Sequence, residues 1–591
     1  MLDMDAQHAN TYLIEPPRTQ MLNRLWEFQR AKQYISDADI ITLAKDYNIS
    51  EIEIEGIVSF YHFFHRKPAG KYTIYLNNSM TSHMKGFNRI LEAFERETAA
   101  KAGSTDPTGT FGLFLTPCIG LSDQEPAALI NFYPFTNLNT LKVRNIITQL
   151  KKGVPLEEIY DKPKKNILFT TEDKASIFFS EFKSGSAISS LVALQPDGVI
   201  NALRETRLSG RGGAFYPTWM KWQAAADEKA TPKVVVCNAD EGEPGTFKDR
   251  VLLHDVPETV IEGMIVCAYA VGASFGLIYL RAEYTWLQNR IEKALQRYRD
   301  KGLLGKSCGG ITNFNFDIRL QLGAGSYVCG EETALLESAE GKRGEPRTRW
   351  FYPVQKGYLN LPTVVNNVET FSAVTRIVEL GVDCFRSYGI EKSPGTKIIS
   401  VSGDCKYPGI YEIEWGMTLG ELLDKCGAED PHYIQESGPS GTVLTLDEQD
   451  VPFAMFAEFF SQHIRCGGAL TIFNKNRDIL DILLNYADFY KKESCGICTP
   501  CRAGNYFIER KLERLKNGLA NHEDIEELKQ WSIIMRHTSR CGLGKTATNS
   551  LINTIEKFEE YFDGMIQQDK SALNVGFDME AAIRDYEEFK N

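Results

Sequence analysis

Four cysteines in the last fifth of the chain have the spacing of a metal-binding motif. Three of them are three residues apart in SCGICTPCRAG (494–504), where glycine and proline interrupt a continuous helix. The nearest downstream cysteine is Cys541, in RHTSRCGLGKTA. Cys-x2-Cys-x2-Cys is typical of iron–sulfur loops, whereas structural zinc more often takes two separate Cys-x2-Cys pairs. We therefore predict a [4Fe-4S] cluster, with zinc or unligated thiols as the alternatives, and its ligands are Cys495, Cys498, Cys501 and Cys541.

A glycine cluster with one arginine lies between two helical stretches, in SGRGGAFYPTWMKW (209–222). Its glycines would let successive backbone N–H groups close on an anion, and Arg211 would add positive charge. The stretch is not a dinucleotide fingerprint, because Phe215 stands at the third glycine position and no strand directly precedes it. An anion-binding loop and a plain glycine turn are both compatible with this pattern.

Three further stretches place polar side chains at the ends of expected strands. The acids of NADEGEPGTFKDR (238–250) directly follow the apolar run KVVVC, and LGAGSYVCGEETALLE (322–337) also follows a strand and opens a helix. LPTVVNNVETF (361–371) puts two asparagines beside a helix start. Open α/β sheets bind ligands at the carboxyl ends of their strands, so these stretches predict a ligand site. For the acids, a solvated run of charge is the alternative.

Composition limits the class of protein. The net charge of −12 argues against nucleic acid as a partner. The N-terminus lacks the basic and apolar parts of a signal peptide. The longest apolar window, 260–280, contains Glu262 and three glycines, which favours a buried helix followed by a strand over a membrane span. Together with 13 cysteines, these features predict a cytoplasmic protein without direct membrane insertion.

The periodicity of apolar residues along the sequence predicts an α/β chain of several domains. Helical patterns come first, then alternating strands, then an α/β layered region after a Lys/Pro-rich connector. A β-rich module with the turn YPG follows, and its short helix should begin at Thr418 and stop at Gly427. Helical patterns then continue to the end. The predicted regions are 1–70, 71–150, 165–390, 395–480 and 482–591.

Together, the motifs resemble the NADH-binding flavoprotein subunit of respiratory complex I and of its soluble relatives. The likeness runs from about 165 to 560, with the motifs in the family's order. It implies a Rossmann-like FMN/NADH domain over 165–390, a β-grasp module over 395–480 and a C-terminal helical bundle that binds the [4Fe-4S] cluster.

The resemblance also assigns residues. It implies FMN contacts from Gly210, Arg211, Gly212, Gly213, Lys221, Asn238, Asp240, Asn366 and Asn367. Around the nicotinamide and its ribose it places Glu243, Tyr327, Glu331 and Glu332, of which Glu243 and Glu332 are the expected catalytic residues. Glu241 and Gly330 belong to the same cofactor site. Tyr216 and Tyr352 could stack on adenine, although the family usually has Phe at these positions and glycine at that of Phe215.

The front region, residues 1–150, has a resemblance of its own. GIVSFYHFFHRKPAGKYTIYLNNSMTSHMKG and TPCIGLSDQEPAALIN are similar to the thioredoxin-like [2Fe-2S] partner subunit of the same enzymes. Its four ligand positions fall on Asn77, Ser82, Cys118 and Ser122, so one cysteine is left. Since asparagine and serine are poor iron–sulfur ligands, we predict that this domain carries no cluster and acts as a separable docking surface.

The resemblance implies a diaphorase. Hydride would pass between NAD(H) and FMN, and single electrons would pass to the [4Fe-4S] cluster. A fused front domain without its cluster resembles that of the large diaphorase subunits of soluble NAD-reducing nickel–iron hydrogenases. The expected partners are therefore an iron–sulfur electron-transfer subunit and, through it, a hydrogenase module. The alternatives are the same module of an NAD-dependent formate dehydrogenase or of complex I, and a non-catalytic scaffold.

The cysteine motif can be tested directly. Cys541→Ser should abolish the paramagnetic signal of the reduced cluster and leave flavin bound, because Cys541 is far in sequence from the glycine cluster. Iron analysis of the unaltered chain should give about four atoms per flavin. Zinc without iron in protein prepared anaerobically would refute the assignment.

Overall fold

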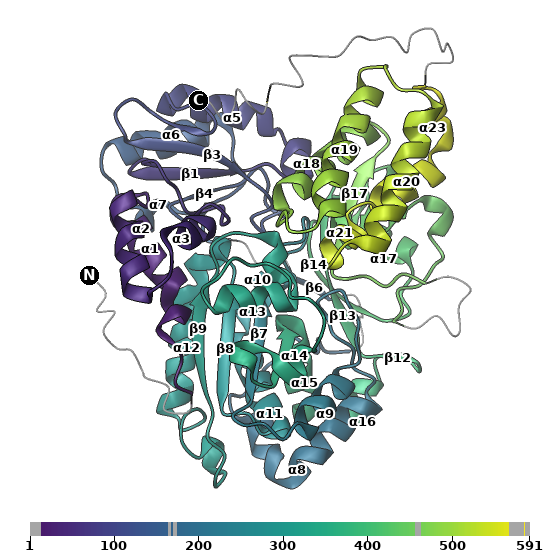
Figure 1. The fold of residues 1–591 in the computed structure, drawn as a ribbon. Helices are drawn as coiled ribbons and strands as arrows, with labels where there is room; N and C mark the ends of the chain where they lie inside the picture. The colour runs from purple at the N-terminus through teal and green to yellow at the C-terminus, as the bar shows by residue number, and fades with distance from the viewer. Residues whose placement is uncertain (1–12, 164–166, 170–173, 456–462, 567–583, 585–591) are drawn as a thin grey trace. The chain divides into compact units, whose positions relative to one another are not determined.

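The computed structural model describes residues 13–163, 167–169, 174–455, 463–566 and residue 584 (Figure 1). The chain forms two compact units, Met1–Arg477 and Asp478–Asn591. Parts of the predicted regions lie outside the described residues, namely 1–12, 165–166, 170–173, 456–462, 567–583 and 585–591.

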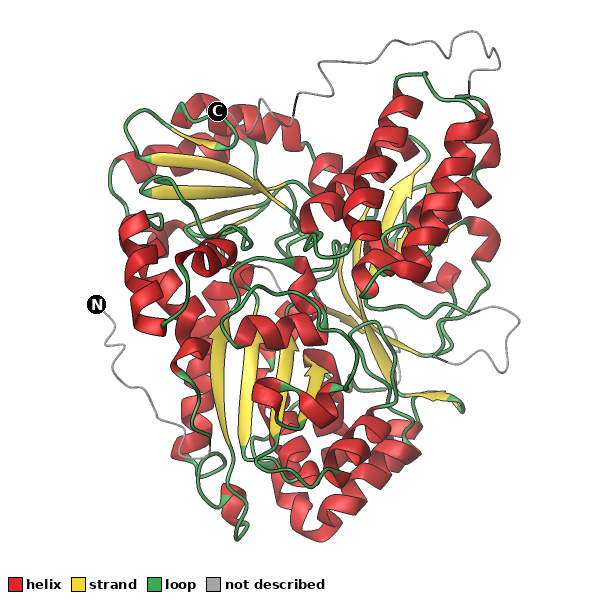
Figure 2. Ribbon diagram, viewed as in Figure 1, coloured by secondary structure: helices red, strands yellow, loops and turns green. Residues whose placement is uncertain are grey.

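A four-stranded parallel sheet forms the centre of the first unit. Its strand order is β10-β7-β8-β9, and each neighbouring pair runs parallel. The strands are β7 (Val234–Ala239), β8 (Phe275–Leu280), β9 (Asp317–Leu322) and β10 (Thr363–Asn367). Figure 2 shows their arrowheads pointing the same way. The carboxyl ends of all four strands therefore lie at one edge of the sheet.

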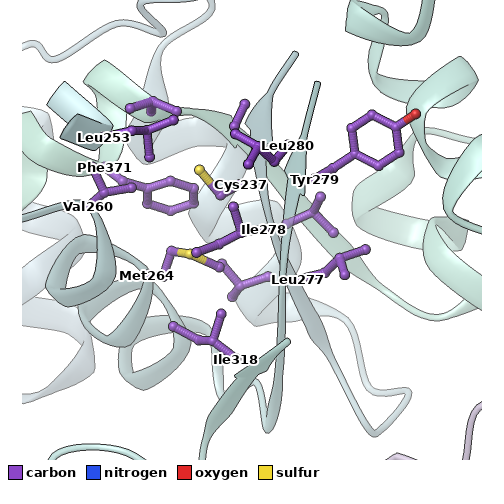
Figure 3. Packing of buried hydrophobic residues seen from close by; sticks show 14 of the residues in the cluster. Cys237, Leu253, Val260, Met264, Leu277, Ile278, Tyr279, Leu280, Ile318 and Phe371 are labelled. Carbon is purple, nitrogen blue, oxygen red and sulfur yellow. The ribbon is translucent and has the colours of Figure 1, made fainter. Parts of the chain in front are cut away.

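Helices connect and cover these strands, as the alternating pattern predicted. They are α8 (Ser186–Glu205), α9 (Thr218–Asp227), α10 (Lys248–Asp255), α11 (Pro257–Val271), α12 (Gln288–Asp300), α13 (Glu332–Ala339), α14 (Pro353–Lys356), α15 (Val368–Leu380) and α16 (Val382–Arg386). The predicted buried helix and strand in the apolar window are α11 and β8. In Figure 3, Met264 of α11 lies beside Ile278, while Leu277 and Tyr279 point to the other face of the sheet.

The front region has three helices followed by a five-stranded sheet of order β2-β3-β1-β4-β5. The helices are α1 (Met21–Lys32), α2 (Asp37–Tyr47) and α3 (Glu51–Val58). The strands are β1 (Tyr72–Asn77), β2 (Ser104–Thr105), β3 (Phe111–Thr116), β4 (Ala128–Ile130) and β5 (Tyr133–Phe135), with α4 (Met80–Met84), α5 (Phe87–Thr98), α6 (Thr140–Lys151) and α7 (Leu156–Ile159). The two strands predicted in this region are β1 and β3.

The front region shares a hydrophobic core with the central sheet. Buried side chains of α1 and α3, such as Leu25 and Ile57, belong to the same cluster as Val235 and Leu277 of the sheet. Apolar burial on this scale is the main stabilising force in folding, so removing residues 1–150 would expose core surface of the central region. The expectation that residues 1–150 can be removed without loss of activity does not agree with this packing, while their role as a docking surface stays a prediction.

The β-rich module forms a six-stranded sheet of order β16-β15-β17-β13-β14-β6. Its elements are β13 (Thr396–Gly403), β14 (Gly409–Glu414), α17 (Leu419–Cys426), β15 (Pro431–Glu436), β16 (Val443–Leu444) and β17 (Ala469–Asn474). Thr418 caps α17 with Glu421 in a capping box, and Gly427 ends it with φ +61°, as predicted. The edge strand β6 (Ile167–Phe169) comes from before the central sheet and pairs with β14, which sequence pattern did not indicate.

The second unit is helical over its described residues. Its helices are α18 (Ile479–Glu493), α19 (Thr499–Lys516), α20 (His522–Thr538), α21 (Gly542–Thr546), α22 (Asn549–Lys557) and α23 (Glu559–Asp563). A search of the described residues in both units finds no helix with the length and apolar character needed to cross a membrane.

Candidate functional site

Loops from several strands meet at the carboxyl edge of the parallel sheet. The acid loop (240–247) follows β7, the tyrosine loop (323–331) follows β9, and β10 ends at Asn367 where α15 begins. The glycine loop (209–217) reaches the same edge beside α15. Figure 1 shows α10 and α13, which follow the acid and tyrosine loops, at this end of the sheet.

The glycine loop is held against the start of α15 and leaves open space above its last glycine. The N–H of Arg211 donates to Thr370 Oγ1 (2.9 Å), and a Cβ on Gly212 would lie 3.3 Å from Cβ of Asn367. Gly213 has φ +100°, and no heavy atom lies within 4 Å of the place where its Cβ would be. A phosphate or a flat ring can therefore approach the backbone closely here.

Phe215 adopts a backbone conformation that favours glycine, with φ +53°. Its side chain is buried in the hydrophobic core of the β-rich module, where the guanidinium carbon of Arg465 lies 5.0 Å from the ring centroid. This burial explains how the loop accommodates phenylalanine where the related family has glycine.

Arg211 does not extend from the loop as expected. Its side chain is fully buried, with the guanidinium carbon 5.2 Å from the ring centroid of Trp415. Its three guanidinium nitrogens make no hydrogen bond with any described residue. The contact of Arg211 with FMN that the resemblance implies stays a prediction.

Lys221 and Trp222 tie α9 to the end of β10. Lys221 Nζ donates to the carbonyl of Val365 (2.9 Å) and lies 3.1 Å from Glu332 Oε2. Trp222 Nε1 donates to Asn366 Oδ1 (2.9 Å). This hydrogen bond fixes the orientation of the side-chain amide of Asn366, one of the predicted site residues. The structure thus brings Lys221, Glu332 and Asn366 together, as the resemblance implied.

The ends of β7 and the tyrosine loop are joined by Asn238. Its Nδ2 donates to the carbonyl of Gly330 (2.8 Å), and its Oδ1 accepts from the N–H of Asp240 (3.1 Å). Glu331 caps α13, where its carboxylate accepts from two N–H groups of the first turn (3.0 and 2.9 Å). Glu331 therefore fixes the start of the helix that carries Glu332.

Glu243 connects three segments. Tyr327 donates its hydroxyl to Oε2 (2.5 Å), and the N–H of Ser440, in the Gly438–Ser440 turn of the β-rich module, donates to Oε1 (3.0 Å). Burial raises the pKa of Glu243 to about 7, although both hydrogen bonds favour the charged form. A carboxyl group in this state changes charge near neutral pH.

Glu241 joins the acid loop to the start of α10. It is buried, and its carboxylate accepts from the N–H groups of Asp249 (2.9 Å) and Arg250 (3.1 Å) at the start of α10. The hydroxyl of Tyr284 also donates to it (2.8 Å). These contacts hold the acid loop against α10, and the place of Glu241 in the cofactor site stays a prediction.

A buried network of charges lies beneath the site. Lys248 Nζ lies 2.6 Å from Asp249 Oδ1 and 3.1 Å from Glu369 Oε2, and Lys397 Nζ lies 2.6 Å from the same Glu369 oxygen. Asn367 Nδ2 donates to Asp249 Oδ2 (2.6 Å). Burial disfavours the charged form of Glu369, but the charges of Lys397 and Lys248 outweigh it and lower its pKa to about 2. The network fixes Asn367 against α10.

Sequence reasoning missed Ser440, Lys248 and Lys397. Lys248 lies in the acidic stretch 238–250 and could have been noticed there as the counter-charge of neighbouring acids. Ser440 and Lys397 carry no local signal, because they reach the site only through the packing of the β-rich module on the central region.

The two predicted stacking residues are exposed. Tyr216 precedes α9 and Tyr352 precedes α14, and these two helices are in contact. Trp350 and Phe351 are also exposed, so this part of the surface is rich in aromatic side chains. Aromatic rings of this kind can stack on a purine base.

The four cysteines of the metal motif lie in the second unit at the ends of helices. Cys498 is the N-cap of α19, and Cys541 is the N-cap of α21. Between Cys495 and Cys498 the chain turns at Gly496, which has φ +76°. Cys501 lies in the first turn of α19. A Cβ on Gly544 would lie 3.0 Å from Cβ of Cys501, so the two cysteine segments approach closely.

The thiols of these cysteines interact with one another. Burial raises the pKa of Cys501 to about 12, and the other three cysteines, Cys498, Cys541 and Cys495, add to this. Ser494 Oγ lies 3.2 Å from its sulfur, and Asn505 Nδ2 donates to it (3.4 Å). Clustered thiols with hydrogen bonds to sulfur suit an iron–sulfur cluster. Among the described residues, no group of three or more His, Cys, Asp or Glu has the geometry of a site for a single metal ion.

Three of the four positions that align with cluster ligands in the front domain hold amide or hydroxyl side chains, and the fourth is Cys118. Cys118 Sγ lies 3.5 Å from Ser122 Oγ, and Asn77 donates to Glu125. Glu125 is buried, which raises its pKa to about 8, and Ser82 is fully buried beside it. That this domain carries no cluster stays a prediction.

Three family models match the chain. The Nuo51 FMN-binding domain matches residues 203–376, the thioredoxin-like [2Fe-2S] ferredoxin matches residues 7–151, and the NADH-ubiquinone oxidoreductase-F iron-sulfur binding region matches residues 481–564. The loops at the sheet edge fall almost wholly within the first match, and the four cysteines fall within the third.

Similar proteins cover nearly the whole chain. The NAD-reducing hydrogenase HoxS subunit alpha of Cupriavidus necator is 45% identical over 96% of both chains. A subunit of the NADH-quinone oxidoreductase of Aquifex aeolicus is 38% identical over 64% of this chain and 88% of its own. A chain in the crystal structure of an NAD⁺-reducing [NiFe]-hydrogenase in the H₂-reduced state matches 96% of both chains, with 33% identity and a TM-score of 0.87.

The buried network should be sensitive to loss of one cation. Lys397→Met should lower the free energy of unfolding by about 3 kcal/mol, because it removes a buried partner of Glu369. The matched control is Lys475→Met, which breaks the exposed pair with Asp430 and should cost less than about 1 kcal/mol. Urea denaturation measures both, and equal losses would show that the network does not stabilise the fold.

Proposed function

The chain belongs to the family of NADH-binding flavoprotein subunits shared by complex I and NAD-reducing hydrogenases, and from that membership we propose how its sheet-edge residues work. The family's enzymes are NAD-dependent flavin iron–sulfur oxidoreductases, and this chain has the matching FMN-binding and [4Fe-4S] regions. The observation that carries the proposal is that the Glu243–Tyr327 hydrogen bond, the Lys221–Glu332 ion pair and the open glycine loop all belong to segments at the carboxyl edge of the parallel sheet.

FMN supplies the redox chemistry when it is bound: it exchanges a hydride with NAD(H) and single electrons with an iron–sulfur cluster. The residues at the sheet edge fit this group. Gly212 and Gly213 offer exposed backbone without side chains, and Asn238, Asn366 and Asn367 offer amide groups whose orientations are fixed by hydrogen bonds. We assign these residues and Lys221 to flavin binding.

Glu243 and Glu332 are assigned to the nicotinamide side of the site. As a carboxylate, Glu243 is purely an acceptor and can hold an amide or ribose hydroxyl of the nucleotide. Tyr327 and Ser440 orient it. Glu332 is held by Lys221, so the charge of the pair is balanced before substrate arrives. Tyr216 and Tyr352 lie on exposed surface where adenine can stack.

Cys495, Cys498, Cys501 and Cys541 are assigned as ligands of the [4Fe-4S] cluster. The start of α19 at Cys498 places positive partial charge near the thiolates, which favours an anionic cluster. Burial of Cys501 and Cys541 limits water around the sulfurs. Both features would influence the reduction potential.

We propose an iron–sulfur electron-transfer subunit as the direct partner, leading to a nickel–iron hydrogenase module, in the cytoplasm. Similarity to HoxS subunit alpha over nearly the whole chain supports the partner. In the second unit, the exposed large apolar side chains Ile497, Phe507, Ile533 and Ile534 lie on or beside α19 and α20 and offer a contact surface. All 13 cysteines are free, which suits a reducing compartment.

The role of Glu243 predicts a pH dependence. Because the carboxylate form binds the nucleotide, kcat/KM for NADH should rise with pH through about 7, the pKa of Glu243. Tyr327→Phe removes a hydrogen bond that lowers this pKa. The pH at which kcat/KM rises should therefore increase by about one unit. Glu243→Gln should lower kcat/KM and remove the rise. Reduction of an artificial one-electron acceptor by NADH measures all three.

Flavin content is the control for these variants, since neither change should release FMN. An unchanged pH profile in Glu243→Gln would contradict the assignment of Glu243, whatever the activity.

The partner assignment predicts the metals of the native complex. Purified under anaerobic conditions, the complex should contain nickel in proportion to flavin and a second iron–sulfur subunit. Molybdenum or tungsten in place of nickel would point to a formate dehydrogenase and overturn the assignment.

A further inference from the structure

We propose that the front region positions the two loops that carry Glu243 and Tyr327, with Asp123, Arg250 and Tyr61 as positioning residues for the reaction with NADH. The inference rests on the proposed function of those loops. The contacts come from two parts of the front region, the segment 118–125 and a set made of Trp26 and residues 61–63. We call these two sets of contacts the bracket.

The first part of the bracket is a buried ion pair. Asp123 lies in the segment 118–125, which in the related partner subunit carries cluster ligands. Arg250 Nη2 lies 3.1 and 3.2 Å from the two carboxylate oxygens of Asp123, and both side chains are only 2% exposed. The Nε and Nη1 atoms of Arg250 make no hydrogen bond with any described residue. Asp123 therefore supplies the counter-charge of a cation at the start of α10.

The same segment reaches the acid loop through Arg281. Its Nη2 donates to the carbonyl of Cys118 (2.8 Å), and its Nη1 donates to the carbonyl of Glu241. One guanidinium thus joins the front segment to the acid loop. Gly120 packs so closely that a Cβ there would lie 2.1 Å from the hydroxyl of Tyr284, which itself donates to Glu241.

These contacts meet at Glu241, which is two residues before Glu243 in the chain. The N–H of Arg250 donates to Glu241 (3.1 Å), so the ion pair, α10 and the acid loop are joined in one hydrogen-bonded set. Glu243 has little freedom to move independently, because Glu241 is fixed on one side and Phe247 donates its N–H to Ser400 (2.9 Å) on the other. A shift of the front segment would therefore move the carboxylate that meets NADH.

The second part of the bracket holds the tyrosine loop. The N–H groups of His62 and Phe63 donate to the carbonyls of Gly325 (2.9 Å) and Ala324 (3.1 Å), and Trp26 Nε1 donates to the carbonyl of Gly323 (2.9 Å). A Cβ on Gly325 would lie 2.5 Å from the ring of Phe63. The backbone carbonyls of the residues just before Tyr327 thus accept hydrogen bonds from α1 and from the segment after α3.

Tyr61 adds a contact between the front region and α13, the helix that follows the tyrosine loop. Its hydroxyl lies 2.6 Å from Ser338 Oγ, which also lies 2.7 Å from the hydroxyl of Tyr279 in β8. The three buried hydroxyls connect the segment after α3, α13 and the sheet in one chain of hydrogen bonds. Both residues that bind each other across the site, Glu243 and Tyr327, are therefore supported by the front region.

The inference gives the front domain a role that does not need a cluster. The hydrogen bonds of Cys118, Ser122, Asn77 and Glu125 preserve the path of the segment 118–125 without metal. That path is what places Asp123 against Arg250. Retention of the domain after loss of its ligands then follows from the geometry of the nucleotide loops.

The test uses Asp123→Asn in the full chain with FMN bound. Removal of the carboxylate charge should loosen the acid loop and raise KM for NADH about fivefold or more, since small misplacements weaken substrate contacts strongly. Amide hydrogen exchange should become faster in residues 238–247. The matched control is Asp161→Asn, which breaks the partly exposed ion pair between Lys142 of the front region and Asp161 in the connector that follows it, and which should change neither value.

Tyr61→Phe provides the second measurement, with faster exchange expected in residues 322–330. The inference is overturned if wild-type protein oxidises NADH while Asp123→Asn leaves KM and exchange in 238–247 unchanged, or if Asp161→Asn has the same effect. If Asp123→Asn does not fold, unchanged exchange and KM in Tyr61→Phe overturn it. Failure of wild-type protein to oxidise NADH would instead reject the proposed function, because the exchange measurements do not depend on activity.

Discussion

The parallel pairing of β7 with β8 and β10 is the constraint on which the site depends. Since the strands run in one direction, every loop that leaves a carboxyl end must turn at the same edge of the sheet. The acid loop, the tyrosine loop and the start of α15 meet there although they are far apart in sequence. In an antiparallel sheet of the same order, the adjacent strands β7 and β10 would end at opposite edges, and the acid loop could not have met Asn367 at the start of α15.

Placing so many polar groups at one buried edge requires compensation of their charges. Glu369 keeps its charge because two lysines surround it, while Glu243 has only neutral hydrogen-bond donors and is held near its titration point. The first arrangement gives Glu369 a constant negative charge beneath the glycine loop. The second leaves Glu243 able to change its protonation state when substrate binds. The same fold thus uses one carboxylate for structure and another for binding.

Much of this organisation could be predicted from the sequence, because its signals are local. The short helix after Thr418, the strand before the acidic stretch and the spacing of the four cysteines depend on neighbouring residues. The pairing of β6 with β14 and the contact of Ser440 with Glu243 could not be predicted, since they join segments more than 190 residues apart in the chain. The contacts of Glu241 with α10 could not be predicted for a related reason: a carboxylate that caps a helix and one that binds a ligand look alike in sequence.

The central claim is that electrons from NADH enter at the sheet edge and reach the iron–sulfur cluster of the same chain. Anaerobic titration of the purified chain with NADH, followed by absorbance and by electron paramagnetic resonance together, tests this most directly. The account predicts bleaching of the flavin bands and appearance of the signal of a reduced [4Fe-4S] cluster. It would be contradicted if NADH changed neither spectrum while a strong chemical reductant changed both.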